Sequence, residues 1–328
     1  MKKHVINFLS GFEKENIGET FPLGYCLPVY HCVSDESLPH LKNIIPYKNT
    51  RQFVQDLDFL ARHFQFVNWD EFKEFVNGSF QPQKKIALLT FDDGLREFYD
   101  TVMPILERKG IYAINFINPA FIDNTGLMFR CKASLLAEKV KSDKNIHPDL
   151  FSILPSKEDP VRQILKTGYL KQSLLNRLAE LLEIDFNEFL RKHQPYMTLG
   201  QLKGAAQKGF GISSHSWDHP LYHELSVGKQ LETTGKTFGY LKQHGFLYES
   251  FAFPFTDFGV KKDFFDQMFQ NEEVFCTFGC AGIKLDSVER NFQRIPMENG
   301  EPAETILKKE MAYFRLKKLL NKNKIERL

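Results

Sequence analysis

The stretch KIALLTF, residues 85–91, is a nearly continuous apolar run of the length of one strand. Such runs are typical of strands that are buried on both faces in a parallel sheet covered by helices. Between it and the next runs lie segments in which apolar residues recur with helical spacing. The alternation of strands and helices predicts an α/β fold with right-handed crossovers. Further strand-like runs stand at 25–31, 111–117, 209–215, 249–255 and 273–279.

The segment from about 128 to 194 interrupts this alternation. It is charged and helical in its periodicity, and it has no strand pattern. We therefore expect a helical insertion within one α/β domain that spans 25–300, preceded by an N-terminal extension at 1–24. Packing or oligomerisation is the simplest role for the insertion, and a lid over a site is the alternative.

The C-terminal piece, 301–328, predicts a basic helix in which Tyr313, Leu316 and Leu320 share one face. We expect this helix to pack on the main domain. Peripheral contact with an anionic membrane surface is the alternative interpretation, since a basic amphipathic helix can also lie on such a surface.

Charge and apolar content exclude several classes of protein. The formal net charge of the 328 residues is only +2, with no basic stripe interleaved with aromatic residues, which argues against a nucleic-acid partner. No stretch approaches the roughly 18 apolar residues of a membrane span. The N-terminal apolar run, Val5 to Leu9, is too short for the core of a signal peptide. We therefore expect a cytoplasmic protein.

The five cysteines are scattered and odd in number. Without a signal peptide, reduced thiols are expected rather than a disulfide framework. Cys276 and Cys280 have a spacing that could suggest a metal site, but their surroundings, EVFCTFGCAG, favour buried thiols at the end of a strand.

Two adjacent carboxylates, Asp92 and Asp93, follow the strand at 85–91 and precede Gly94. Their mutual repulsion is costly unless a positive group lies nearby or one of them holds a proton. A simple turn is one explanation, because Asp-Asp-Gly is good turn chemistry anywhere. A functional site is the other.

A second polar cluster, SHSWDHP, ends the strand-like run at 209–215 and contains His215 and His219. The carboxyl ends of parallel strands converge on one face of a sheet or barrel. The two histidines and one aspartate would then supply three metal ligands and leave a position open for water, as in catalytic divalent-metal sites. The remaining aspartate would be free to act as a base toward that water.

The order and wording of TFDDG, SHSWDHP and FAFPF resemble the NodB-homology polysaccharide deacetylases, carbohydrate esterase family 4. The flanking PVYHCVSD and QRIPM agree with this resemblance, which covers most of 25–300 apart from the insertion. It implies a distorted (β/α) barrel that removes acetyl groups, most readily N-acetyl, from a carbohydrate.

Transferred position by position, the resemblance implies that Asp92 is the general base. It also implies that Asp93, His215 and His219 bind zinc (Zn²⁺), although another divalent transition metal would suit the same ligands. An acetylated carbohydrate is then the expected partner. The candidate substrate-binding residues are Pro254 and Phe255 in the third motif and Trp217 in the second.

The sequence departs from the family pattern at two places. Ala252 stands where the third motif usually has the arginine that braces the base, so Asp92 is expected to lack a charge that lowers its pKa. In addition, no histidine follows His244, so the family's C-terminal acid is missing. His31, at a strand end, is the candidate catalytic acid; Asp92 returning its proton is one alternative, and a purely structural His31 is another.

The sequence thus predicts a metal-dependent deacetylase of an acetylated sugar. A non-catalytic glycan-binding or scaffold protein with the same fold is the competing hypothesis. Hydrolysis of a non-sugar amide at the same site is a third.

Overall fold

The computed structural model describes residues 16–143, 148–156 and 158–327. Its centre is an eight-stranded sheet in which every pair of neighbouring strands is parallel, in the order β11-β9-β8-β7-β6-β5-β2-β12. The predicted α/β fold is confirmed. The strands are β2 (Pro28–Tyr30), β5 (Leu89–Asp92), β6 (Ala113–Ile117), β7 (Gly211–Ser214), β8 (Ser250–Ala252), β9 (Cys276–Gly279), β11 (Asn291–Gln293) and β12 (Ile295–Pro296).

One passage of chain closes this sheet into a barrel. The strand β11 pairs with β9 at one edge, and β12 pairs with β2 at the other. Only Arg294 separates β11 from β12, so the two edges of the sheet are joined through a single residue. A (β/α) barrel with a distorted closure, as the sequence resemblance implied, is therefore what the chain forms.

Two small parallel sheets extend the structure. Strands β1 (Tyr25–Cys26), β3 (Gln65–Phe66) and β4 (Ile86–Ala87) form one of them, and β1 and β4 run into β2 and β5 after one residue each. The other joins β10 (Leu285–Asp286) to β13 (Lys324–Ile325) near the C-terminus. The apolar run at 85–91 is thus one long strand with a break at Leu88.

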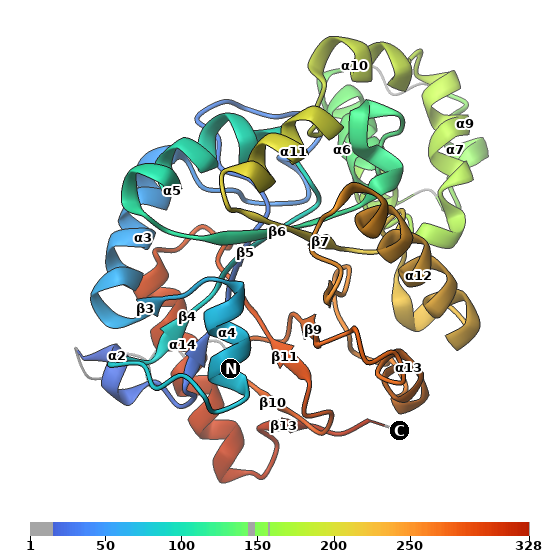
Figure 1. Ribbon diagram of the computed structural model, residues 1–328. Coiled ribbons are helices and arrows are strands. Elements are labelled where there is room, and N and C mark those ends of the chain that lie inside the picture. Colours follow the sequence, from blue (N-terminus) through green and yellow to red (C-terminus); the bar gives the residue numbers. More distant parts are fainter. Residues whose placement is uncertain (1–15, 144–147, 157, 328) are drawn as a thin grey trace.

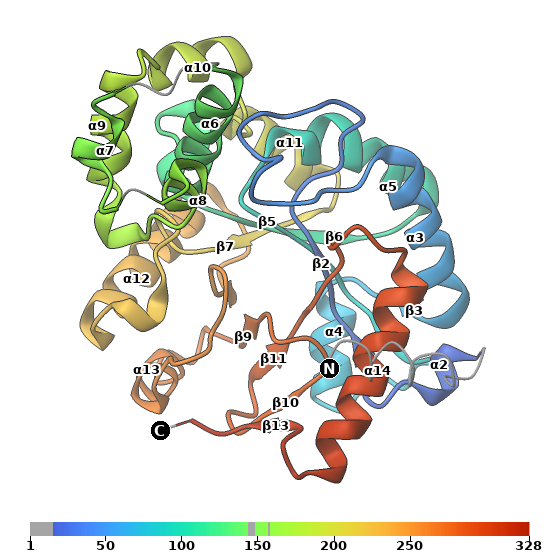
Figure 2. The same ribbon diagram turned by 180° about the vertical axis from the view of Figure 1, so that it is seen from behind.

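Helices surround the barrel, as Figures 1 and 2 show. Capping boxes at Asn49, Asn68 and Thr198 begin three of them. The helices outside the insertion are α2 (Ile17–Thr20), α3 (Thr50–His63), α4 (Trp69–Val76), α5 (Met103–Lys109), α11 (Leu199–Gln207), α12 (Val227–His244), α13 (Lys262–Met268) and α14 (Ala303–Leu319). Short helices of other types lie at η1 (Phe98–Val102), η2 (Pro119–Asn124) and η4 (Tyr222–Glu224).

Two clusters of buried apolar side chains pack against the strands of the barrel, one on each face of the sheet. The alternation of side chains along β6 separates them, since Ala113 and Ile117 belong to the cluster shared with α3 and α5, whereas Phe116 belongs to a cluster with Phe278 and Phe292. The second cluster fills the barrel, and Phe72 of α4 joins it.

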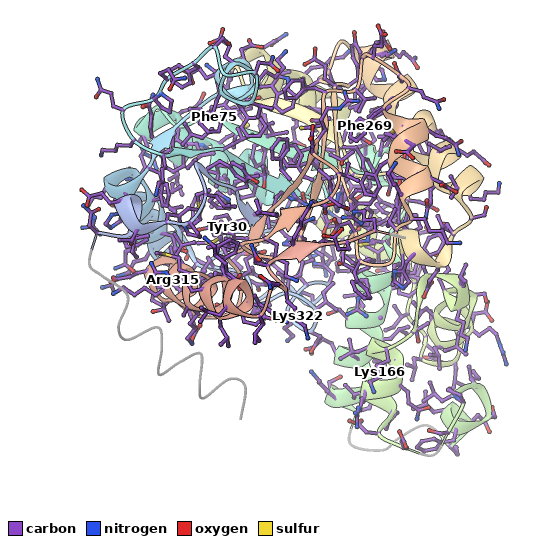
Figure 3. The ribbon with its side chains drawn as sticks, turned by 90° about the horizontal axis from the view of Figure 1, so that it is seen from below. Tyr30, Phe75, Lys166, Phe269, Arg315 and Lys322 are labelled. Carbon is purple, nitrogen blue, oxygen red and sulfur yellow. The ribbon has the colours of Figure 1, made fainter. Side chains whose placement is uncertain are left out.

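The insertion forms a helical lobe with a core of its own, drawn in green in Figure 1. In Figure 3, Lys166 marks this lobe at one corner of the molecule, away from Tyr30 in β2. The same apolar cluster includes Cys32, Leu41 and Leu95, which follow β2 and β5. The lobe therefore rests on the loops at the carboxyl ends of the strands. Its elements are α6 (Phe129–Ser142), α7 (Leu150–Ile153), α8 (Pro160–Leu165), η3 (Tyr169–Lys171), α9 (Ser173–Leu181) and α10 (Phe186–His193).

The C-terminal helix is shorter than the sequence predicted. The helix α14 ends at Leu319, and the chain continues into β13. Its buried residues, which include Ile306, Leu307 and Met311, pack in the cluster that also holds α3, whereas Leu320 is exposed. Leu320, which was expected to share a face with Tyr313 and Leu316, lies just past the end of the helix, because the tail after Leu319 leaves the helix to pair with β10.

The sequence also predicts that the chain has no signal peptide, no membrane span and no disulfide framework. The N-terminal run from which the lack of a signal peptide was inferred, Val5 to Leu9, lies outside the described residues. None of the described helices is long and apolar enough to cross a membrane. All five cysteines are free thiols, and Cys276 is fully buried.

Candidate active site

The turn after β5 is built so that it projects Asp93. Asp92 ends the strand, and Asp93 and Gly94 both have positive φ, 74° and 65°. A Cβ atom at Gly94 would lie 3.2 Å from Cγ2 of Ile117 and 3.4 Å from Cδ1 of Ile122. Only glycine combines the required φ with this close approach. The Asp-Asp-Gly stretch is therefore both a turn and the support of two buried carboxylates.

The two histidines lie on a loop after β7 and not on a helix. Ser216 and His219 have φ values of 69° and 64°, and the backbone N–H of His219 donates to Oγ of Ser216 at 3.2 Å. The Asn118 amide donates to the backbone oxygen of Ser216 at 3.1 Å. The loop is thus locked by hydrogen bonds, and His215 and His219 are both buried, with ring centroids 5.0 Å apart.

Asp93, His215 and His219 have the arrangement of three metal ligands. Their ligand atoms lie within 4.8 Å of one another. Oδ1 of Asp93 lies 3.2 Å from Nε2 of His219 and 3.6 Å from Nε2 of His215. Two ligands about 2.1 Å from a tetrahedral zinc ion lie about 3.4 Å apart, so these separations fit. Oδ1 of Asp93 is buried and has no hydrogen-bond partner in the described part of the chain, which leaves it available to a cation.

The surroundings of His215 favour a neutral imidazole. Its Nδ1 lies 2.8 Å from the carbonyl oxygen of Ala252, which can only accept, so Nδ1 carries the proton and Nε2 presents its lone pair. Burial lowers the pKa of His215 to about 4. Burial acts in the opposite direction on Asp93, but the nearby charge of His219, with those of His31 and His215, outweighs it and lowers the pKa of this carboxyl. A neutral imidazole and an ionised carboxylate are the forms that bind metals.

Asp92 is paired with an arginine that the sequence motif did not reveal. The Arg294 guanidinium donates from Nη1 to Oδ1 of Asp92 at 2.6 Å and from Nη2 to Oδ2 at 2.8 Å. Both side chains are buried. Burial alone would raise the pKa of Asp92, but the charge of Arg294, with that of His215 and the paired hydrogen bonds, holds it below its usual value.

The expectation that Ala252 leaves Asp92 without a bracing charge is therefore wrong. The arginine comes from the junction of β11 and β12 instead of the third motif, and it reaches the same carboxylate from the closing side of the barrel. Ala252 contributes its backbone oxygen to His215.

His31 lies directly after β2 and is held by Glu298. Its Nδ1 lies 2.6 Å from Oε2 of Glu298, and the backbone N–H groups of His31 and Cys32 each donate to this carboxylate at 2.9 Å. Burial opposes protonation of the imidazole, but the charge and hydrogen bond of Glu298, with the nearby charges of Asp93 and Asp92, raise the pKa of His31 to about 9. The ring is partly exposed, at 26%.

The three predicted substrate-binding residues are placed differently from one another. Phe255 is 39% exposed, and its ring centroid lies 4.4 Å from that of His219 and 6.0 Å from that of Phe129 in the insertion. Pro254, beside it, is buried. The Trp217 ring packs on α12 instead, where Nζ of Lys236 lies 3.6 Å from the ring centroid. This contact with α12 does not link Trp217 to Phe255.

Backbone strain is concentrated here. Within 16–143, 148–156 and 158–327, nine non-glycine residues have positive φ, and four of them, Asp93, Ser216, His219 and Phe255, belong to this site. A bulky residue such as Phe255, with φ of 57°, is rarely found in this region. Strained residues gather at functional sites because the surrounding structure holds side chains there in required positions.

Sequence reasoning missed Arg294 and Glu298. Both belong to or follow the segment QRIPM, which was recognised only as a closing strand. An arginine within a segment expected to form a closing strand is a signal in itself, because such a residue is almost never fully buried unless it is paired.

The sequence profile described as polysaccharide deacetylase matches residues 80–259. This range covers more than half of the chain and contains the two polar strand ends and the third motif. The protein belongs to the polysaccharide deacetylase family, as the resemblance to NodB-homology proteins indicated. No curated protein matches the sequence significantly.

Solved structures share the fold. The deacetylase PplD of Streptococcus pyogenes, in complex with acetate, is 17% identical, with a TM-score of 0.56 over 87% of this chain and 97% of that one. IcaB from Ammonifex degensii is 16% identical, with a TM-score of 0.54 over 88% and 97%. A de-N-acetylase from Aggregatibacter actinomycetemcomitans is 15% identical, with a TM-score of 0.50 over 86% and 99%. At these identities the likeness concerns the fold.

Proposed function

We propose that this protein is a metal-dependent deacetylase that hydrolyses an N-acetyl group of a carbohydrate. The observation that carries the proposal is the convergence of Asp92, Asp93, His215 and His219 at one end of the barrel, with Asp92 held ionised by Arg294. A scaffold protein has no need of a base and a set of metal ligands in this arrangement. Family membership and the likeness to structures described as deacetylases support the same choice.

Asp93, His215 and His219 would hold the metal, for which zinc is the first candidate. When bound, a divalent ion of this kind polarises the acetyl carbonyl and lowers the pKa of a water molecule. The protein's own contribution is to keep Asp93 ionised and His215 neutral with Nε2 free, as described above.

Asp92 is then the general base. It takes a proton from the water that attacks the acetyl carbon, and Arg294 keeps both carboxylate oxygens oriented while this happens. His31 is the general acid: the C–N bond breaks, the electron pair stays on nitrogen, and the nitrogen takes a proton from Nε2. The products are acetate and a free amino sugar. A partly exposed, protonated His31 supplies the acid that the C-terminal part of the sequence lacks.

The exposed ring of Phe255 would stack on a sugar ring beside the reacting acetyl group. The insertion reaches this place, because Phe129 contacts Phe255 and the Tyr169 hydroxyl donates to Oδ2 of Asp218 at 2.7 Å, in the loop between the two histidines. The insertion would thus support one side of the substrate site. Pro254 and Trp217 would act by shaping the loops on which Phe255 and the histidines stand.

The test combines metal content, by mass spectrometry, with acetate release from N-acetylated oligosaccharides. The wild type is expected to contain metal and release acetate. Asp93→Ala should lose the metal, whereas Asp92→Asn should keep it and lose activity by a factor of about 10² to 10⁴. An active Asp92→Asn variant would contradict the base assignment. Failure of the wild type to bind any divalent metal would overturn the proposal.

A further inference from the structure

Glu298 lies beside His31 because of the way the barrel closes. In the parallel pairing of β12 with β2, Ile295 lies opposite Pro28 and Pro296 opposite Val29. The same register, continued past the strand ends, places Glu298 opposite His31. The two residues are 267 positions apart in the sequence.

Both oxygens of the Glu298 carboxylate bind groups directly after the end of β2. The Glu298 side chain is only 3% exposed. Oε2 accepts from the backbone N–H of His31 at 2.9 Å and binds the ring Nδ1 at 2.6 Å, while Oε1 accepts from the backbone N–H of Cys32 at 2.9 Å. These three contacts fix the position of the carboxylate beside the ring. With Nδ1 occupied, Nε2 is the nitrogen left for a reacting group.

The groups that face His31 decide its charge. Glu298 is the strongest of the negative neighbours, and Asp93 and Asp92 follow. Burial acts against the charged imidazole, so the pKa of about 9 depends on these carboxylates. A divalent ion on Asp93 would cancel much of its effect, which leaves Glu298 as the negative charge dedicated to His31.

We propose that Glu298 is a positioning residue of the deacetylation: it holds His31 in place with Nδ1 bound, so that Nε2 delivers a proton to the departing nitrogen. This inference rests on the proposed function. After the transfer His31 is neutral, and because its ring is partly exposed, it regains the proton from solvent. Glu298 neither gives nor takes a proton in this step.

The experiment compares the pH dependence of kcat/KM in the wild type and in Glu298→Gln, both loaded with zinc. The protonated acid is present below the pKa of His31, which Glu298 raises, so wild-type activity should fall as the pH rises through that pKa. In Glu298→Gln the pKa of His31 should move toward or below its ordinary value of about 6.5. The alkaline limb should then shift down by at least one pH unit, with kcat/KM at pH 8 reduced on the order of tenfold. Metal content should not change.

Glu301→Gln is the matched control, because Glu301 belongs to the same segment but pairs with Lys309. Its alkaline limb should coincide with that of the wild type. An unshifted limb in Glu298→Gln would overturn the proposal. If that variant does not fold, an NMR titration of His31 in the wild type, assigned with His31→Asn, decides instead: a pKa below 7 overturns the inference. This titration also separates the inference from the proposed function, since it requires no turnover.

Discussion

Arg294 is the residue on which the arrangement of the site depends most. It is fully buried, and its guanidinium forms two parallel hydrogen bonds with Asp92. Nε also donates to the backbone oxygen of Gly279 at 3.3 Å, and the guanidinium lies 5.3 Å from the Phe116 ring centroid. The planar fork of arginine can satisfy all of these contacts, whereas the compact ammonium of lysine cannot.

We therefore expect Arg294→Lys to lower kcat/KM on the order of tenfold or more, with metal content unchanged, because the base keeps a positive neighbour but loses its fixed orientation. Arg294→Met should in addition lower the free energy of unfolding by about 3–5 kcal/mol, since it leaves a buried carboxylate without its partner. Kinetics and denaturant unfolding measure the two effects.

A double-mutant cycle provides the control. In the Asp92→Asn background the buried charge is gone, so Arg294→Met should cost much less stability than it does in the wild type. Equal costs in both backgrounds would show that Arg294 stabilises the barrel through its other contacts and not through Asp92.

At the scale of the element, the turn after β5 combines strain with close packing. Gly94 and Gly110 have nearly the same φ, 65° and 63°, but only Gly94 has side-chain atoms close to where a Cβ would stand. The pair separates the cost of left-handed backbone from the cost of crowding.

Gly110→Ala is expected to lower the free energy of unfolding by about 1–2 kcal/mol, the cost of a left-handed alanine, without affecting the metal. Gly94→Ala should cost more, because the new methyl group meets Ile117 and Ile122, and it should weaken metal binding by displacing Asp93. Unfolding curves and metal titrations check both variants. Equal metal affinity in the two would show that the turn does not position Asp93.

For the insertion, the sequence is compatible with packing, oligomerisation or a lid. Its core continues into the loops after β2 and β5, and Tyr169 is hydrogen-bonded to Asp218. These contacts attach it to the mouth of the barrel on more than one side, which favours a fixed wall over a moving lid.

At the scale of the whole molecule, the C-terminal tail is attached by an ion-pair network. Arg327 contacts Asp257 and Asp286, whose side chains are 1% exposed, and Gln293 donates to the same two carboxylates at 2.6 and 3.1 Å. Asp257 follows β8 and Asp286 lies in β10, so one arginine joins the tail both to a loop of the barrel and to the small sheet that β10 forms with β13.

Arg327→Ala should lower the free energy of unfolding by about 3–5 kcal/mol, because two buried carboxylates lose their only charged partner among the contacts described here. Lys318→Ala, an exposed basic residue of the same C-terminal region, should have little effect. Thermal and denaturant unfolding of the two variants measure these changes in the free energy of unfolding. The Asn291 amide also donates to Asp257 and Asp286, at 2.8 and 2.9 Å. A stable Arg327→Ala variant would mean that the amides of Asn291 and Gln293 suffice to hold the carboxylates.

The amino-acid sequence by itself determined the alternation of strands and helices, the Asp-Asp-Gly turn and the two-histidine loop. These are local features: each motif is continuous in the chain, and its position after an apolar run places it at a strand end. The convergence of the motifs follows from the parallel sheet. The family could be recognised from them for the same reason.

Only the tertiary structure decided which residues support the base and the candidate acid. Arg294 reaches Asp92 across 202 positions, and Glu298 reaches His31 across 267. Both contacts depend on the register in which β12 joins β2, and no local pattern specifies that register. From the motifs alone, the missing arginine predicts a base without a bracing charge, and the missing histidine predicts the loss of the C-terminal acid. In the structure, Arg294 of the closing segment supplies the charge for Asp92, and Glu298 supplies the partner for His31.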